Sequence, residues 1–218
     1  MIILIFHFEL LFFSGKTKAD NLYSVREFGN QCILYTLDEV LRYGDVLNII
    51  QADESNRVVE RKDVSLFEND ALREAIINAF VHNKWVSGNE PMISVFSDRI
   101  EILSRGELAS EQTLSGFFAG VSVPVNRKLS EIFLQLQISE KTGRGVPKIT
   151  EKYGKKAFCF NENSIVVKIP FGGNHLLLNN HCLWPDKMWL MKVHICQLFI
   201  IYFFSFSYKL KINKADCP

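Results

Sequence analysis

Three polar side chains recur every fourth residue inside an otherwise apolar stretch near the middle of the chain. They are Glu74, Asn78 and His82, which carry a carboxylate, an amide and an imidazole. On a helix this spacing places the three groups along one line of the surface, where they can face a common ligand. Asn78 is the most informative, because asparagine is a poor residue for a helix interior and a buried amide needs hydrogen-bond partners. A nucleotide or an ordered water would supply them, whereas Glu74 taken alone could be a solvated surface residue.

A second chemical signal is the glycine-containing segment 140–147, which reads EKTGRGVP. Gly143 and Gly145 precede Pro147, and proline suits the first helical position, so the segment predicts a tight loop that opens a helix. Such a loop points backbone N–H groups and a helix N-terminus at one place, which suits phosphate. A plain turn between two helices is the alternative for the same two glycines.

The helix that must carry the polar line has the strongest periodicity in the chain. Asn69 or Asp70 can cap its N-terminus. Its apolar residues recur at i, i+3, i+4, i+7 and i+8 and form a core-facing stripe: Leu72, Ala75, Ile76, Ala79 and Phe80. The polar line lies on the other side of this stripe, so packing of the helix would hold Glu74, Asn78 and His82 at a pocket.

The remaining elements follow from periodicity and turn signals. We expect helices over 37–50, around 129–136 and after the glycine loop, strands over 57–64, 92–96, 99–103 and 164–170, and a flexible loop over 109–125. This mixture predicts an α+β sandwich, with helices packed on one face of a mixed, mostly antiparallel sheet.

Composition bounds the class of protein. The chain has 218 residues and a formal net charge of +1, which excludes an acidic tail and a strongly basic nucleic-acid surface. Residues 174–218 carry a net charge of +3 and the first 173 residues carry −2. This shift, with Gly172 and Gly173 after a strand-like segment, predicts a boundary near residue 172.

The 18 phenylalanines are concentrated at the two ends of the chain. The run over 1–13 could be the apolar core of a secretory signal, but it has no basic flank and no cleavage pattern, so we favour a buried or truncated strand. The uncharged run over 195–208 is shorter than the roughly 20 residues of a membrane helix, so we expect no membrane association. Five widely spaced cysteines favour reduced thiols and a cytoplasmic protein.

Three segments together resemble a known family: REAIINAFVHNKW (73–85), DRIEILSRGEL (98–108) and EKTGRGVPKI (140–149). In this order they are similar to the ATP-binding domain of the GHKL superfamily, and the resemblance covers roughly residues 20–171. It is nearest to the branch in transcriptional regulators of bacteria and archaea that are described as related to the ATP-dependent DNA helicase RecG. Those proteins place a Schlafen/AlbA-like DNA-binding domain before this module and a winged helix after it. The resemblance implies the Bergerat-type two-layer sandwich, here with irregular terminal segments.

The resemblance also implies roles for individual residues. Glu74 would be the catalytic residue that polarises the attacking water, and Asn78 would help to hold Mg²⁺ between the phosphates of ATP. Mg²⁺ prefers oxygen ligands and keeps several waters, so one amide oxygen with phosphate oxygens is a plausible set. The other nucleotide-binding residues that the resemblance implies are His82, Ser104, Gly106, Thr142, Gly143, Arg144 and Gly145.

One departure from the superfamily concerns the base. Most members recognise adenine through an aspartate in D-x-G-x-G, and the equivalent stretch here begins at Ser104 and continues through Gly106 and Glu107. A serine hydroxyl can accept the same hydrogen bond, but a neutral acceptor is weaker than a charged one. Adenine affinity is therefore in question, and Glu107 would oppose a phosphate if it pointed inward.

We expect a nucleotide-binding module of a DNA-associated transcriptional regulator that binds ATP and Mg²⁺, with hydrolysis slow or absent. DNA would be bound only through domains that this chain lacks, and self-association into a homodimer is an additional expectation. The alternatives are a degenerate scaffold or dimerisation module without nucleotide, and a fragment of a protein described as an ATP-dependent DNA helicase. Translocation on DNA is not expected, because the chain has no G-x-x-x-x-G-K-[ST] phosphate loop.

The expected organisation has three parts. Residues 1–66 would be the remnant and connector of an upstream Schlafen/AlbA-like domain, residues 67–172 the GHKL-like domain, and residues 173–218 an atypical tail, disordered or frame-disrupted. Nothing in this tail resembles the linker and winged helix of the family, and a truncated or frame-disrupted gene product would explain it.

Overall fold

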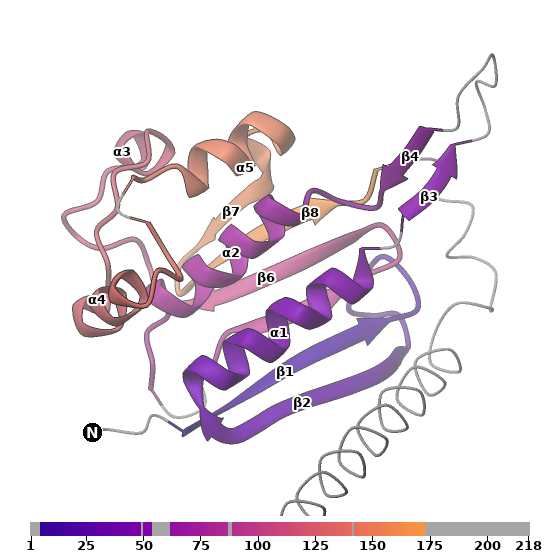
Figure 1. Cartoon of the computed structure of the whole chain (residues 1–218), viewed down its shortest axis with the longest axis horizontal. Helices are drawn as coiled ribbons and strands as arrows, with labels where there is room; N and C mark the ends of the chain where they lie inside the picture. The colour runs from indigo at the N-terminus through magenta and orange to yellow at the C-terminus, as the bar shows by residue number, and fades with distance from the viewer. Residues whose placement is uncertain (1–4, 49, 54–61, 87–88, 141, 173–218) are drawn as a thin grey trace, which may run out of the picture. The chain divides into compact units, whose positions relative to one another are not determined.

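The computed structural model describes residues 5–48, 50–53, 62–86, 89–140 and 142–172. Figure 1 shows the described chain as helices packed over one face of a sheet. Six strands form this sheet in the order β2-β1-β5-β6-β8-β7, and two short strands, β3 and β4, pair separately. The strands are β1 (Ile5–Phe13), β2 (Leu22–Cys32), β3 (Ile50–Asp53), β4 (Lys62–Ser65), β5 (Met92–Val95), β6 (Arg99–Arg105), β7 (Phe158–Asn161) and β8 (Ser164–Pro170). Only the β1–β5 pair is parallel within the six-stranded sheet, so the predicted mixed, mostly antiparallel α+β fold is confirmed.

The N-terminal apolar run forms a strand in the interior of the sheet, with irregular pairing to β2 near each of its ends. Phe8, Leu10 and Phe12 alternate toward the helices and are 2%, 2% and 4% exposed. The Phe8 ring lies 5.3 Å from the Phe80 ring on the facing helix. The strand alternative is thus confirmed for residues 5–13, and the phenylalanine surplus at this end has a packing reason.

The sheet contains strands from both sides of the predicted division at residue 66. β1 lies between β2 and β5, and its parallel register places Leu10 beside Ile93. The division itself stays a prediction, but the elements before residue 48 are integral to the sheet that carries the later motifs.

The first helix differs from its predicted range. We expected a helix over 37–50, and α1 spans Ile33–Leu47. It begins directly after β2 because Ile33 in its first turn is 5% exposed and already packs in the core. Gly44 lies against the next helix, since a Cβ there would lie 3.0 Å from Cδ2 of Leu72. This glycine therefore permits close helix packing at a point where the sequence had indicated only a weak position.

The predicted helix with the polar line is confirmed as α2 (Asn69–His82). The predicted caps are wrong, because Asn69 and Asp70 are inside the helix and Glu68 occupies the N-cap without a side-chain capping bond. Asn69 instead accepts a hydrogen bond from the Asn48 amide. The apolar stripe packs on the sheet, where Ile76 and Phe80 are each 1% exposed.

The segment over 109–125 contains a short helix where the sequence predicted only a loop. α3 spans Leu114–Phe118, and Thr113 caps it by accepting a hydrogen bond from the Gly116 amide at 3.1 Å. Five residues are too few to show helical periodicity, so the pattern could not reveal it. The remaining described helices are α4 (Arg127–Gln135), α5 (Gly145–Tyr153) and a single 3₁₀ turn (Lys155–Ala157).

Two expectations fall partly or wholly outside the described residues. The strand expected over 57–64 corresponds to β4, of which only Lys62–Ser65 is described, and the tail over 173–218 is not described at all. Among the described helices, none is both long and apolar enough to cross a bilayer.

Candidate functional site

A pocket with a cavity of about 130 Å³ lies between α2, α5, the sheet and the segment that contains α3. It brings together residues from three motifs that are far apart in the sequence. Eight of the nine predicted site residues line it: Glu74, Asn78, His82, Ser104, Thr142, Gly143, Arg144 and Gly145. Gly106 does not line the pocket; it directly follows β6 with a φ of 113°, and its amide donates to the Asn163 carbonyl.

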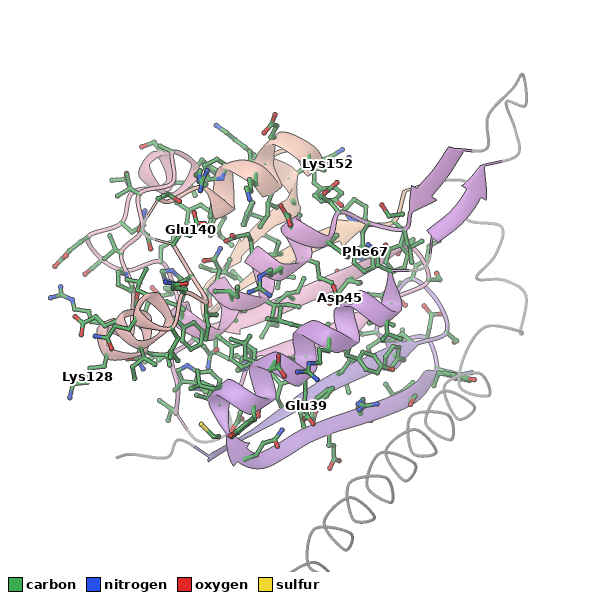
Figure 2. The ribbon with its side chains drawn as sticks, in the orientation of Figure 1. Glu39, Asp45, Phe67, Lys128, Glu140 and Lys152 are labelled. Atoms are coloured by element: carbon green, nitrogen blue, oxygen red, sulfur yellow. The ribbon has the colours of Figure 1, made fainter. Side chains whose placement is uncertain are left out.

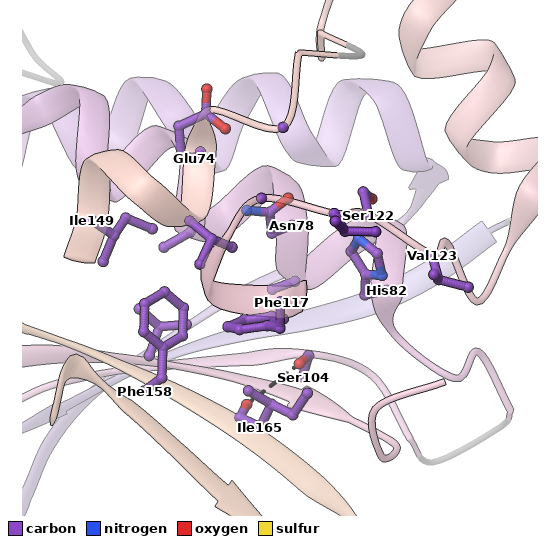
Figure 3. Close-up of a pocket in the computed structure, with 18 of the residues that line it drawn as sticks. Glu74, Asn78, His82, Ser104, Phe117, Ser122, Val123, Ile149, Phe158 and Ile165 are labelled. Carbon is purple, nitrogen blue, oxygen red and sulfur yellow. Dashed lines mark hydrogen bonds between the residues drawn. The ribbon is translucent and has the colours of Figure 1, made fainter. Parts of the chain in front are cut away.

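The polar line of α2 faces this pocket because the opposite side of the helix is buried on the sheet. Figure 3 shows Glu74, Asn78 and His82 following one another along the pocket. Burial raises the pKa of the Glu74 carboxyl, and the nearby Lys148 ammonium partly offsets that rise. Burial also lowers the pKa of His82, so its imidazole is neutral at pH 7. The wall from α2 thus combines a carboxyl of raised basicity with two neutral polar groups.

The N-terminus of α5 approaches this wall at Gly145. A Cβ on Gly145 would overlap the Glu74 carboxylate and would lie 3.3 Å from Nδ2 of Asn78. Glycine places no side chain between the backbone and the polar line, although the Glu74 carboxylate ends a flexible side chain that could turn away from a Cβ here. The backbone N–H groups that begin a helix and the two polar side chains consequently share one end of the pocket.

The floor of the pocket is apolar with one polar atom. Five strand residues form it: Ile102 and Ser104 from β6, Phe158 from β7, and Ile165 and Val167 from β8. Ser104 is 8% exposed, and its hydroxyl donates to the Ile165 carbonyl at 3.3 Å, as the dashed line in Figure 3 marks. Its proton is directed at that carbonyl, so the oxygen can still accept a hydrogen bond from a ligand. Glu107 also lines the pocket, but it is exposed.

Thr142 and Arg144 are held by Glu140. The Arg144 guanidinium forms an ion pair with the Glu140 carboxylate at 2.6 Å and donates to the Thr142 hydroxyl at 3.1 Å. Thr142 in turn donates to Glu140 at 3.0 Å. These hydrogen bonds and charges hold the pKa of Glu140 below its usual range. The two residues predicted to contact phosphate thus lie at the pocket, but their donors serve a local carboxylate.

The glycine loop crosses the α3 segment at Gly120. Gly120 and Gly143 have φ angles of 83° and 65°, and a Cβ on either would overlap the carbonyl oxygen of the other. Phe117 of α3 lines the pocket and lies edge-on to Phe158 with ring centroids 5.2 Å apart. Sequence reasoning missed this side of the pocket. The glycines Gly116 and Gly120 indicate a turn in this segment, but they do not indicate which other segment it packs against.

The donor set limits what kind of metal could bind. Within the described part of the chain, no group of three or more His, Cys, Asp or Glu residues could hold a metal ion. The oxygens available from α2 are those of Glu74 and Asn78, so an ion here would draw most of its ligands from phosphate and water. Mg²⁺ binds in this manner, whereas a structural zinc or calcium site does not.

One family matches a part of the chain that contributes most of the floor and the glycine loop of the pocket. Residues 88–166 match the family described as "Putative ATP-dependent DNA helicase recG C-terminal", which is a GHKL-like ATPase family. The match confirms the resemblance over this segment and supports a nucleotide-binding module. It covers β5 to the first three residues of β8 and begins after α2. Glu74, Asn78 and His82 therefore lie outside the matched residues, and their roles stay predictions.

Comparison with solved structures concerns the fold alone. The DIP2311 protein from Corynebacterium diphtheriae is similar with a TM-score of 0.59 and 16% sequence identity. The alignment covers 76% of this chain and 34% of that protein, so the chain spans about a third of its length. A search of curated proteins finds no match to this chain.

Proposed function

We propose that this chain, whose residues 88–166 match the family described as "Putative ATP-dependent DNA helicase recG C-terminal", binds ATP with Mg²⁺ in the pocket between α2 and α5. Hydrolysis is slow or absent. The observation that carries the proposal is the close approach of Gly145 to Glu74 and Asn78. This approach places a helix N-terminus, which favours anions, against a carboxyl and an amide that can serve a hydrated cation.

The apolar floor with its buried serine hydroxyl supports a planar base at this side of the pocket. The base would lie on Ile165 and Phe158, and the phosphates would extend toward the open end at α5. Ser104 offers an acceptor rather than a donor at the floor, since its proton is bonded to Ile165. This favours a base that presents an amine, as adenine does.

The chemistry at the phosphate end would be carried by Glu74 and Asn78. Mg²⁺, when bound, would neutralise charge on the phosphates, and the Asn78 amide and Glu74 carboxylate are the oxygens that would hold it. Glu74 is also the group that would accept a proton from an attacking water. Burial raises its pKa, which makes it a stronger base than an ordinary carboxylate. Thr142 and Arg144 would contact phosphate only after leaving Glu140, and this requirement is consistent with slow turnover.

The regulatory consequence that we propose is conformational. Phosphates at Gly143 and Gly145 would shift the glycine loop and the α3 segment that crosses it, and this change would alter how neighbouring domains are placed. DNA contact, the role in a transcriptional regulator, a Schlafen/AlbA-like neighbour and a cytoplasmic location remain parts of this proposal. A homodimer is compatible with it.

One observation favours a second candidate function, a scaffold or dimerisation module that binds no nucleotide. The crossing of Gly120 and Gly143 and the bonds of Arg144 to Glu140 hold the glycine loop in place without a ligand. Because these contacts stabilise the loop without a ligand, the module could keep its fold after losing the ability to bind nucleotide.

Isothermal titration calorimetry of Mg²⁺-ATP with the full chain separates the two candidates. Truncation before β2 is unsuitable, because β1 lies inside the sheet. We expect saturable 1:1 binding that Asn78→Ala weakens and that Asn163→Ala, a change at an exposed turn outside the pocket, leaves unaltered. If folded protein gives no binding heat at millimolar ATP, the nucleotide-binding function is excluded and the scaffold function remains. Turnover that Glu74→Gln does not change would remove the hydrolytic role of Glu74 and preserve binding.

A further inference from the structure

The pocket has few cations available for a polyphosphate. Its described lining residues include three carboxylates, Glu74, Glu107 and Glu140, and two cations, Arg144 and Lys148. A nucleoside triphosphate carries several negative charges, so carboxylates alone at its phosphate end would oppose it. Binding therefore needs a cationic side chain that can turn to the ligand.

Arg144 is poorly placed to be that side chain. Its guanidinium is bonded both to the Glu140 carboxylate at 2.6 Å and to the Thr142 hydroxyl at 3.1 Å. Glu140 and Arg144 are four residues apart and form a compact local pair. Moving Arg144 to phosphate would break two hydrogen bonds and leave Glu140 near the ligand without a counter-charge.

Lys148 is held much less firmly. It is the fourth residue of α5, and its ammonium lies 3.5 Å from the Asp70 carboxylate at the start of α2. Both ion pairs are open to water, with side chains 45% and 70% exposed for Lys148 and Asp70 and 64% and 61% for Arg144 and Glu140. The difference lies in geometry, because Lys148 has a single contact at 3.5 Å, whereas Arg144 has two at 2.6 and 3.1 Å. Lys148 also acts on Glu74, whose pKa it lowers against the effect of burial. The ammonium is therefore close to the α2 wall of the pocket and has a weak resting partner.

We propose that Lys148 is the phosphate-binding cation of the pocket, and that it leaves Asp70 when a nucleoside triphosphate binds. In the absence of nucleotide, Asp70 holds Lys148 beside the pocket. When nucleotide binds, Asp70 competes with the phosphates for the Lys148 ammonium. This inference rests on the proposed nucleotide-binding function and adds to it the residue that recognises the terminal phosphates. A lysine ammonium has three donors on a flexible stem, so it can follow phosphate oxygens without a fixed geometry.

The same two helices supply a matched control. Lys152 lies one turn later on α5 and pairs with Glu68 at 3.6 Å, with side chains 58% and 49% exposed. Figure 2 labels Lys152 on α5. It does not line the pocket, so its substitution removes the same charge from the same helix and the same kind of ion pair.

The experiment measures dissociation constants for Mg²⁺-ATP and Mg²⁺-ADP with the full chain and its variants. A hydrogen bond to a charged group is typically strong enough to change affinity about tenfold or more. We therefore expect Lys148→Gln to weaken ATP binding about tenfold or more and ADP binding less. Lys152→Gln should change the dissociation constant for ATP by less than about twofold. Asp70→Asn removes the competitor, so we expect it to tighten ATP binding. A purely structural role of the Lys148–Asp70 pair would predict weaker binding instead.

The outcomes separate this inference from the function on which it rests. If the folded wild-type chain binds no nucleotide, the proposed function fails and Lys148 has no ligand to bind. If the wild type binds ATP, and Lys148→Gln and Lys152→Gln have the same dissociation constant for ATP, only the proposed role of Lys148 is wrong. Should Lys148→Gln prove unfolded by circular dichroism, Asp70→Asn decides. Weaker ATP binding in that variant would overturn the proposal, whereas tighter or unchanged binding agrees with a weak resting pair.

Discussion

Alanine at Gly120 and Gly143 tests whether the α3 segment and the glycine loop are packed against each other over the pocket. Both residues have positive φ, and a Cβ on either would overlap the carbonyl oxygen of the other. A left-handed conformation costs a non-glycine residue about 1–2 kcal/mol. Separating two packed segments adds about 1–3 kcal/mol. Each single substitution should therefore lower the free energy of unfolding by about 2–5 kcal/mol.

The double variant distinguishes the crossing from local backbone strain. Once Gly120→Ala has separated the segments, Gly143→Ala adds only its own strain, so the double variant should be less destabilised than the sum by about 1–3 kcal/mol. Gly154 supplies the control, because it also has a positive φ of 77° but its Cβ would meet nothing nearer than Cγ of Lys156 at 3.8 Å. We expect the effects of Gly120→Ala and Gly154→Ala to add.

Urea unfolding followed by circular dichroism gives the free energies of unfolding of the wild type and the five variants under one set of conditions. A coupling between Gly120→Ala and Gly143→Ala within about 0.5 kcal/mol of zero, as is usual for distant sites, would refute the crossing. A coupling of the same size in the control pair would show that the non-additivity comes from somewhere other than the loop contact.

Three further predictions concern the core and the two titratable groups of α2. Phe133 of α4 is 0% exposed, so Phe133→Ala should lower the free energy of unfolding by about 3–5 kcal/mol in urea melts; a loss below about 1 kcal/mol would mean that α4 is not packed as described. The pKa of the Glu74 carboxyl is higher in the folded chain than its usual value, so the free energy of unfolding should fall as pH rises through that pKa. The stability of Glu74→Gln relative to the wild type should therefore be greater at pH 8 than at pH 4. The pKa of His82 is lower in the folded chain than its ordinary value of 6.5, so the wild type should lose stability as pH falls below that value. His82→Gln should lose less stability over the same range. Parallel plots of unfolding free energy against pH for the two proteins would contradict the burial of His82.

The elements with strong local patterns could be predicted from the sequence. The apolar stripe that includes Ile76 and Phe80 fixes which side of α2 is buried, and so it also fixes that Asn78 faces away from the core. The alternation of Phe8, Leu10 and Phe12 likewise indicates a half-buried strand. In both cases the periodicity is a property of neighbouring residues, so one sequence contains all of the information.

The remaining features depend on contacts between distant segments. The sequence does not show that Gly120 meets Gly143, because each glycine taken alone is only a turn signal. Lys148 was not singled out, since a lysine on an amphipathic helix is usually solvated and its approach to Asp70 depends on how α5 crosses α2. The start of α1 at Ile33 was missed because β2 runs directly into it without a capping residue or glycine between them.

The position of a bound non-hydrolysable ATP analogue in a crystal structure of the full chain tests the central claim most directly. We predict that the base lies on the floor beside Ser104 and that the phosphates lie between the N-terminus of α5 and the Glu74–Asn78 side of α2. Electron density for the analogue at another surface, or an empty pocket in crystals grown at saturating Mg²⁺ and analogue, would contradict the account.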